Sequence, residues 1–151
     1  MIVSAETLWR LNQEYGNRLA KARTYFELLE KLIIERSGDD GHLLGILHYI
    51  GGHLNDLKEE HRRWRYTYFY EDPDSKRMVH SEAAIRRAVS AFARMRTRHE
   101  NDLTELSATL NSVPRPHPAV TLVPNGDLWE MTHYALYDLL DFGSFAQTLN
   151  G

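Results

Sequence analysis

Hydrophobic residues recur along this chain at intervals of three and four, the spacing that places them on one side of an α-helix. The first such stretch runs from Ser4 to Ser37, with Ser4 placed to cap the helix and Glu6 in its first turn. A helix of this length extends for roughly 50 Å, which suits an elongated bundle. Its predicted inward positions are Leu8, Leu11, Tyr15, Leu19, Ala22, Phe26, Leu29 and Ile33.

A second stretch with the same period covers residues 42 to about 70, after a break at residues 38–41, which are Gly-Asp-Asp-Gly. Two adjacent glycines, Gly51 and Gly52, lie in its interior, where each costs about 1 kcal/mol relative to alanine. We therefore expect either a kink at this point or the close approach of another backbone. The predicted inward positions are Leu43, Leu47, Ile50, Leu54, Leu57, His61, Trp64 and Tyr68.

The end of this second stretch has two interpretations. Residues 66–70 have strong β propensity, and residues 77–80 can face them across a turn that contains Pro73. We expect the helix to continue here, and a small hairpin in place of its last turn is the alternative.

A third helix is predicted to begin at Ser81 and Glu82, which have the character of a helix start. Three prolines within residues 114–118 end it and open an extended connector over residues 114–126. We expect residues 120–123 of this connector to lie across the bundle. The predicted inward positions of the third helix are Ile85, Ala88, Phe92, Met95, His99, Leu103, Leu106, Leu110 and Val113.

A fourth, shorter helix follows the connector. Asp127 and Glu130 have the spacing of a capping box that opens it, and we expect it to run through Phe142 and to end at Gly143. Residues 144–151 are then a short tail. The predicted inward positions are Leu128, Met131, Ala135 and Leu139.

Together these stretches predict an all-α fold, an elongated antiparallel helical bundle of three long helices and one shorter C-terminal helix, in a single domain over residues 1–151. The composition agrees, because 42% hydrophobic and 26% charged residues are ordinary for a soluble globular chain. No apolar run is long enough to span a membrane, and the first residues lack a secretion signal. We therefore expect a cytoplasmic protein with no membrane partner.

Several kinds of catalytic site are excluded by the residues that are missing. The chain has no cysteine, which excludes disulfides, thiolate nucleophiles and cysteine-ligated metals. It also lacks the glycine-rich loops that hold nucleotide phosphates and the G-x-S-x-G turn that exposes a serine nucleophile. We therefore expect a protein that is not an enzyme and that has no cofactor.

Eight histidines make a metal site in the bundle worth considering. Four-helix proteins that bind two metal ions use two E-x-x-H motifs on facing helices, and only one occurs here, at Glu130 and His133. His61 and His99 lie on predicted inward faces, where a hydrogen-bonded core imidazole is the commoner arrangement. A metal-binding four-helix bundle therefore stays as the second alternative, and no metal ligands are assigned.

Basic residues are concentrated in one part of the chain. Residues 58–99 hold 11 of the 18 lysines and arginines against six acidic residues, whereas the whole chain has a net charge of -3. These residues flank the connection between the second and third helices. An antiparallel hairpin therefore gathers them toward one end of the bundle.

Arginines alternate with aromatic residues within this basic part, at residues 61–70. Guanidinium groups bind phosphates through paired hydrogen bonds, and exposed aromatic rings stack on unpaired bases. The sequence therefore predicts a non-catalytic accessory subunit that binds nucleic acid, either single-stranded or RNA. The residues predicted to contact it are Arg62, Arg63, Arg65, Tyr66, Tyr70, Arg86, Arg87, Arg94 and Arg98.

The same observations fit a different class of protein. Arginines often form a solvated face or pair with nearby carboxylates, such as those of Glu59 and Glu60. Long helices with regular apolar stripes also associate with copies of themselves or with other helices, and separated charge orients such contacts. A protein-interaction or oligomerisation module is therefore the first alternative.

In its plan, about 150 helical residues with arginines concentrated in one region, the chain resembles the small helical subunits of CRISPR effector complexes. The resemblance implies a subunit that lines a nucleic-acid strand without catalysing a reaction. It covers the whole chain but rests on architecture, so it transfers no individual residue. Ferritin-like and DinB-like metal-binding bundles are similar in plan, and their ligand spacings are absent from this sequence.

Overall fold

The computed structural model describes residues 4–37, 41–72, 74, 77–78, 81–112 and 127–148. Within these ranges the α-helices are α1 (Ala5–Ser37), α2 (Gly41–Trp64), α3 (Glu82–Asn111) and α5 (Asp127–Thr148). A short π-helix, η1 (Arg65–Phe69), extends α2, and an antiparallel hairpin of β1 (Tyr70–Asp72) and β2 (Arg77–Met78) follows it. The predicted all-α bundle is confirmed.

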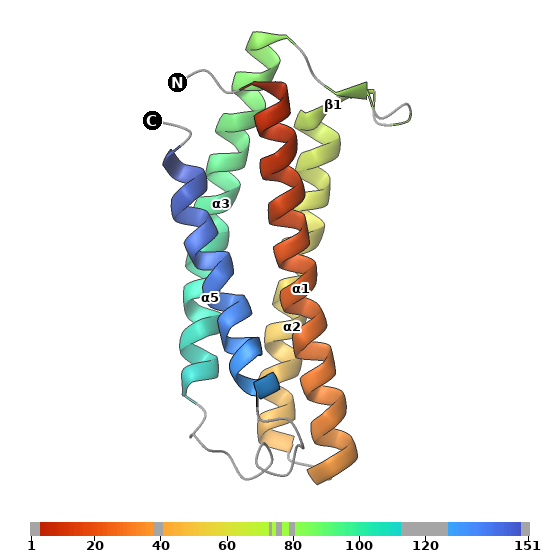
Figure 1. Ribbon diagram of the computed structural model, residues 1–151, viewed down its shortest axis with the longest axis vertical. Coiled ribbons are helices and arrows are strands. Elements are labelled where there is room, and N and C mark those ends of the chain that lie inside the picture. The colour runs from red at the N-terminus through yellow and green to blue at the C-terminus, as the bar shows by residue number, and fades with distance from the viewer. Residues whose placement is uncertain are drawn as a thin grey trace.

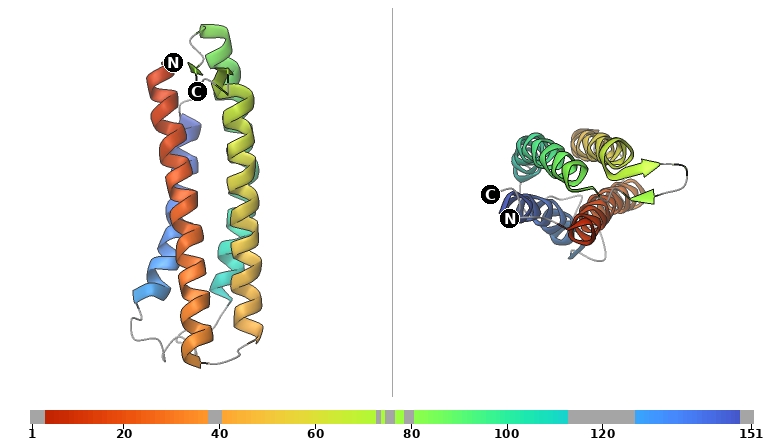
Figure 2. Two further views of the ribbon diagram at one scale, coloured as in Figure 1. Left: turned by 90° about the vertical axis from the view of Figure 1, so that its right-hand side faces the viewer. Right: turned by 90° about the horizontal axis from the view of Figure 1, so that it is seen from above.

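The α-helices run antiparallel along the long axis of the molecule (Figure 1). Seen in cross-section, α1 and α3 occupy opposite corners, and each packs against both α2 and α5 (Figure 2). The end of α2 and the start of α3 lie at the same end of the bundle as β1 (Figure 1). No helix in the described part of the chain is long and apolar enough to cross a membrane.

Two of the predicted helix starts have the predicted serine caps. The backbone N–H three residues after Ser4 donates to its Oγ at 3.1 Å, and the corresponding distance at Ser81 is 3.2 Å. All predicted inward residues of α1, and those of α3 through Leu110, are buried. The side chain of Asp127, the break at residues 38–40 and the connector at residues 113–126 lie outside the described part of the chain.

The π-helix η1 changes which aromatic side chain enters the core. A regular α-helix would place Tyr68 on the same face as the buried Trp64, four residues earlier, but hydrogen bonds in a π-helix span five residues in place of four. Phe69 is therefore 2% exposed, whereas Tyr68 is 38% exposed. The prediction that Tyr68 faces inward is wrong for this reason.

Beyond η1 the chain combines both interpretations of this segment. Helical structure persists through Phe69, and the hairpin begins at Tyr70, whose strand partner is Met78. Trp64 anchors this end to α3, because its indole Nε1 donates to the carbonyl oxygen of Ala88 at 3.1 Å.

α5 is longer than predicted and turns a different face toward the core. It continues through Gly143 to Thr148, because one glycine costs only about 1 kcal/mol in a helix and does not by itself end one. Met131 is 42% exposed, so its predicted inward position is wrong. The residues of α5 that do face inward are Leu128, Thr132, Ala135, Leu136, Leu139 and Phe142.

α2 passes through Gly51 and Gly52 as one helix. A Cβ atom at either position would have no described neighbour within 4 Å, so no other backbone approaches closely. We expect Gly51→Ala and Gly52→Ala each to raise the free energy of unfolding by about 0.5–1 kcal/mol, since alanine restricts the unfolded chain and meets no clash. Urea denaturation of the two single variants measures this, and a loss of stability would contradict an unstrained helix at these positions.

Candidate nucleic-acid interface

The structure divides the predicted interface residues between the two sides of α2. Three of the arginines line a groove between α2 and α3, and two line a pocket between α1 and α2. The groove holds Arg63, Arg94 and Arg98, and the pocket holds Arg62 and Arg65. Neighbouring residues of a helix point about 100° apart, which is why Arg62 and Arg63 face different sides.

The α2/α3 groove is a basic surface with an aromatic ring at its edge. Arg94 and Arg98 lie about one helical turn apart on α3, and Arg63 faces them from α2. Tyr68 joins the groove because η1 turns it outward. The groove has a volume of about 280 Å³ and is lined by Glu60, Arg63, Trp64, Thr67, Tyr68, Ala91, Arg94, Met95 and Arg98.

The arginines of the α2/α3 groove differ in how they are paired. Arg63 and Arg94 are exposed, and neither has a hydrogen bond or an ion pair with another described residue. Arg98 instead donates to Oε1 of Glu60. With three arginines and one carboxylate, the groove carries a net positive charge.

Arg86 and Arg87 lie outside the groove, nearer the start of α3. Arg86 is paired with Glu82 one turn earlier, at 2.5 Å. Arg87 is exposed and has no such partner among the described residues, and it lies seven residues before Arg94, on the same face of α3. Of these two, only Arg87 therefore extends the row of arginines that borders the groove.

The two predicted stacking residues, Tyr66 and Tyr70, do not line the α2/α3 groove. Tyr66 is 45% exposed, and its ring centroid lies 5.9 Å from the guanidinium carbon of Arg62. The hydroxyl of Tyr70 accepts a hydrogen bond from Nη2 of Arg65 at 3.1 Å. Both tyrosines therefore pack with arginines that line the α1/α2 pocket, and their role in stacking stays a prediction.

A buried chain of hydrogen bonds runs from Glu60, at the groove, into the core and joins all four α-helices. Nε2 of His99 donates to Oε2 of Glu60 at 3.1 Å, and its Nδ1 accepts from the hydroxyl of Tyr15. Arg96 is fully buried and donates to the Tyr15 hydroxyl at 2.8 Å and to the carbonyl oxygen of Leu139 at 3.2 Å. Its guanidinium carbon lies 4.5 Å from the centroid of the Tyr15 ring.

The protonation states in this network follow from its surroundings. Burial lowers the pKa of His99 to about 4, although Glu60 opposes the shift. Burial raises the pKa of Tyr15 to about 12, partly offset by Arg96. Partial burial acts to raise the pKa of Glu60, but hydrogen bonds from Arg98 and His99 hold it below its usual value. At neutral pH, Glu60 is therefore ionised and fixes the proton of neutral His99 on Nε2.

The sequence patterns give no role to Arg96 and place Tyr68 in the core. Arg96 lies four residues after Phe92 and three before His99, which is the inward spacing, and this was the available signal for its burial. No comparable signal marks Tyr68, because its exposure depends on η1. Of the two core imidazoles predicted, that of His99 has the expected side-chain partners.

Possible metal ligands do not gather in the part of the chain that the structure describes. No three histidine or carboxylate side chains lie together there in a way that would hold an ion. Glu130 is exposed and His133 half-buried on α5, so the single E-x-x-H motif acquires no facing partner motif within the described residues.

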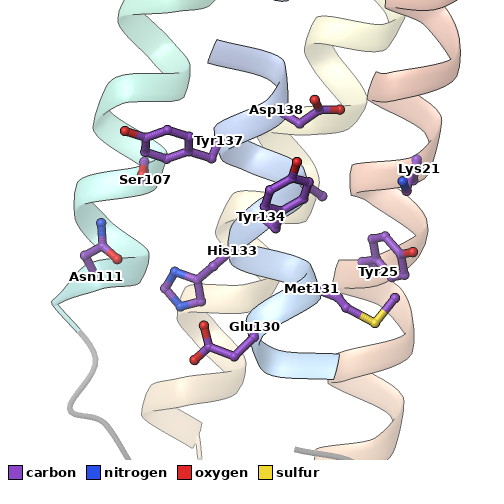
Figure 3. Close-up of a pocket in the computed structure, with 11 residues that line it drawn as sticks. Lys21, Tyr25, Ser107, Asn111, Glu130, Met131, His133, Tyr134, Tyr137 and Asp138 are labelled. Atoms are coloured by element: carbon purple, nitrogen blue, oxygen red, sulfur yellow. The ribbon is translucent and has the colours of Figure 1, made fainter. Parts of the chain in front are cut away.

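A separate surface lies on α5. Met131, Tyr134 and Tyr137 follow one another at intervals of three and are 42%, 69% and 63% exposed. They line a groove of about 790 Å³ that Tyr25 of α1 borders on one side and Ser107 of α3 on the other (Figure 3). A row of exposed aromatic and apolar side chains is typical of surfaces that contact another protein.

Comparison of this chain with protein-family models, with curated proteins and with solved structures found no match. No family is therefore assigned to it.

Proposed function

We propose that this protein is a non-catalytic accessory subunit that binds single-stranded nucleic acid or RNA through the α2/α3 groove. The main support is the placement of Arg63 and Arg94 on facing helices of one groove, where neither has a hydrogen bond or an ion pair with a described carboxylate. An exposed, unpaired guanidinium keeps all its N–H donors for a phosphate. Arg98, which is hydrogen-bonded to Glu60, supplies a third cation in the groove.

The arginines of α3 also have a spacing that suits a phosphate backbone. Arg87 and Arg98 are 11 residues apart on one helix face, with Arg94 between them, which is about 16.5 Å at about 1.5 Å per residue. Tyr68 offers a ring for stacking at the edge of this row. Contacts of this kind bind the backbone and stack on any base, so we expect little sequence preference.

Charge reversal in the groove tests the proposal. We expect the double variant Arg63→Glu, Arg94→Glu to lose at least about tenfold in affinity for labelled single-stranded RNA at low salt. The dependence of log affinity on log salt concentration should become shallower by about 0.7 for each phosphate that the variant no longer neutralises. Fluorescence anisotropy with labelled RNA and DNA strands measures both quantities.

The matched control reverses two cations of α1, Arg23 and Lys31, which changes the net charge by the same amount outside the groove. We expect this control to bind nearly as the wild type does. Equal losses in the two double variants would mean that overall charge, and not the groove, holds the strand. Absence of binding by the wild type would refute the proposal.

Purification at low salt also tests the first alternative, a protein-interaction module. A discrete oligomer that salt dissociates, with no nucleic-acid absorbance, would favour that alternative over the proposed function. The row of Met131, Tyr134 and Tyr137 on α5 is the observation that supports it, because these side chains are large, exposed and contiguous.

A further inference from the structure

A pocket of about 470 Å³ lies between α1 and α2, on the side of α2 that faces away from the α2/α3 groove. Its volume is within the range of small-molecule sites. The walls are polar: they carry four side-chain amides, three cations, a histidine and a glutamate, and no hydrophobic side chain. No residue that lines this α1/α2 pocket belongs to the α2/α3 groove or to the hydrogen-bond network of Tyr15.

Buried polar atoms without a hydrogen-bond partner are concentrated in the lining of the α1/α2 pocket. Asn12 is 1% exposed, and neither its Nδ2 nor its Oδ1 has a partner in the described chain. The same holds for Nε2 of His61, which is 3% exposed, and for Nε of Arg65. A buried polar group left unpaired costs about 1–3 kcal/mol, so folded proteins keep few of them.

The imidazole of His61 and the backbone of Gly16 both form part of the pocket lining. Gly16 of α1 faces this ring, and a Cβ atom at position 16 would lie 3.2 Å from its Cε1. A larger residue there would therefore push the ring. Burial, together with the nearby positive charge of Arg65, lowers the pKa of His61 to about 3, so the ring is neutral at physiological pH and offers one donor and one acceptor.

Positive charge lies at the exposed side of the same pocket. Lys58 and Arg62 are exposed and Arg65 is half-buried, against the single carboxylate of Glu59. Nε of Arg62 donates to Oε1 of Glu59 at 2.9 Å and its Nη2 donates to the same oxygen, and this pairing lowers the pKa of that carboxyl. The site thus combines neutral, planar hydrogen-bonding groups in its buried part with a net positive charge at its rim.

We propose that the α1/α2 pocket binds a nucleotide, with the base against Asn12 and His61 and the phosphate at Lys58 and Arg62. A carboxamide pairs with an adjacent donor and acceptor on a base edge, as asparagine does with adenine. Guanidinium and ammonium groups are the usual partners of phosphate. This inference does not depend on the proposed function, because its residues are not those of the α2/α3 groove.

Titration calorimetry with adenosine 5′-monophosphate as the probe tests this inference. We expect the wild type to bind it and Asn12→Ala to bind at least about tenfold more weakly, because both hydrogen bonds to the base edge are removed. Arg62→Ala changes an exposed side chain, which leaves the fold intact, and is expected to weaken binding by a similar factor. The matched control, Asn101→Ala on the exposed face of α3, should bind as the wild type does.

Asn12→Ala also separates a ligand-binding role from a structural one. Its amide has no hydrogen bond in the described chain, so we expect the variant without nucleotide to be at least as stable as the wild type. The stabilisation that nucleotide gives the wild type should disappear in the variant. A large loss of stability without nucleotide would show that the amide supports the fold and would overturn the assignment.

Further probes identify the ligand. Ribose 5-phosphate should bind much more weakly than the mononucleotide, and equal affinities would overturn the proposal, as would the absence of binding by all common ribonucleoside monophosphates. Competition by a short 5′-phosphorylated RNA would show that the pocket accepts the end of a strand, and its absence would assign the site to free nucleotides. The variant Arg63→Glu, Arg94→Glu should retain mononucleotide binding, which keeps this test separate from that of the proposed function.

Discussion

The variant Tyr15→Phe is expected to have a free energy of unfolding about 2–4 kcal/mol below that of the wild type. The ring and its packing remain, including the stacked contact with Phe142 at 5.6 Å between centroids. The hydroxyl is removed, and with it the hydrogen bonds to Nδ1 of His99 and from Nη1 of Arg96. Both partners are buried and one is charged, so leaving them unpaired is costly.

Tyr25→Phe is the matched control for this measurement. Tyr25 lies on the same helix and is half-buried, and no hydrogen bond of its hydroxyl joins it to another described residue. We expect its removal to change stability by less than about 0.5 kcal/mol. Urea denaturation with an unchanged m-value gives the comparison, and equal stabilities of Tyr15→Phe and the wild type would show that the buried network contributes nothing net.

Stability is also expected to fall steeply in mild acid. In the unfolded chain His61 and His99 take up protons below pH 6.5, whereas the folded protein keeps them neutral until about pH 3 and about pH 4 respectively. Unfolding therefore binds protons in this window, so the free energy of unfolding is highest above pH 6.5 and falls as the pH decreases. At about 1.4 kcal/mol per pKa unit, we expect a loss on the order of 4 kcal/mol between pH 7 and pH 4.5.

Urea denaturation across this pH range measures the loss, and two variants assign it. His61→Phe removes one of the two buried titrating groups, so the decrease should be about half that of the wild type. His42→Gln removes an exposed imidazole on the first turn of α2, and the decrease should be unchanged. A wild-type stability that does not vary between pH 7 and pH 4.5 would contradict the burial of neutral histidines.

The spacing of apolar residues was enough to predict the long helices, because burial of one face decides where a helix forms. It failed at the end of α5 and within η1. Gly143 looks like a helix end in isolation, but α5 continues past it. The π-helix η1 has no pattern in the sequence, and it sets which of Tyr68 and Phe69 enters the core.

The charge layout marks residues 58–99 as rich in arginine but does not show which arginines share a surface. Arg62 and Arg63 are adjacent in sequence and face different helices. Arg94 and Arg96 are the same residue type two positions apart, but Arg94 is exposed and Arg96 is fully buried. Glu59 and Glu60 were predicted as carboxylates that could pair with arginines, and they pair with Arg62 and Arg98 respectively.

The π-helix η1 inserts one extra residue, relative to a regular α-helical turn, between Trp64 and Phe69. The centroids of these two rings lie 6.0 Å apart in the core. Without the extra residue, an aromatic ring would still pack beside Trp64 in the core. Tyr68 would then have no position on the outer side of the helix. The extra residue thus places Tyr68 at the edge of the α2/α3 groove while Phe69 stays buried in the core.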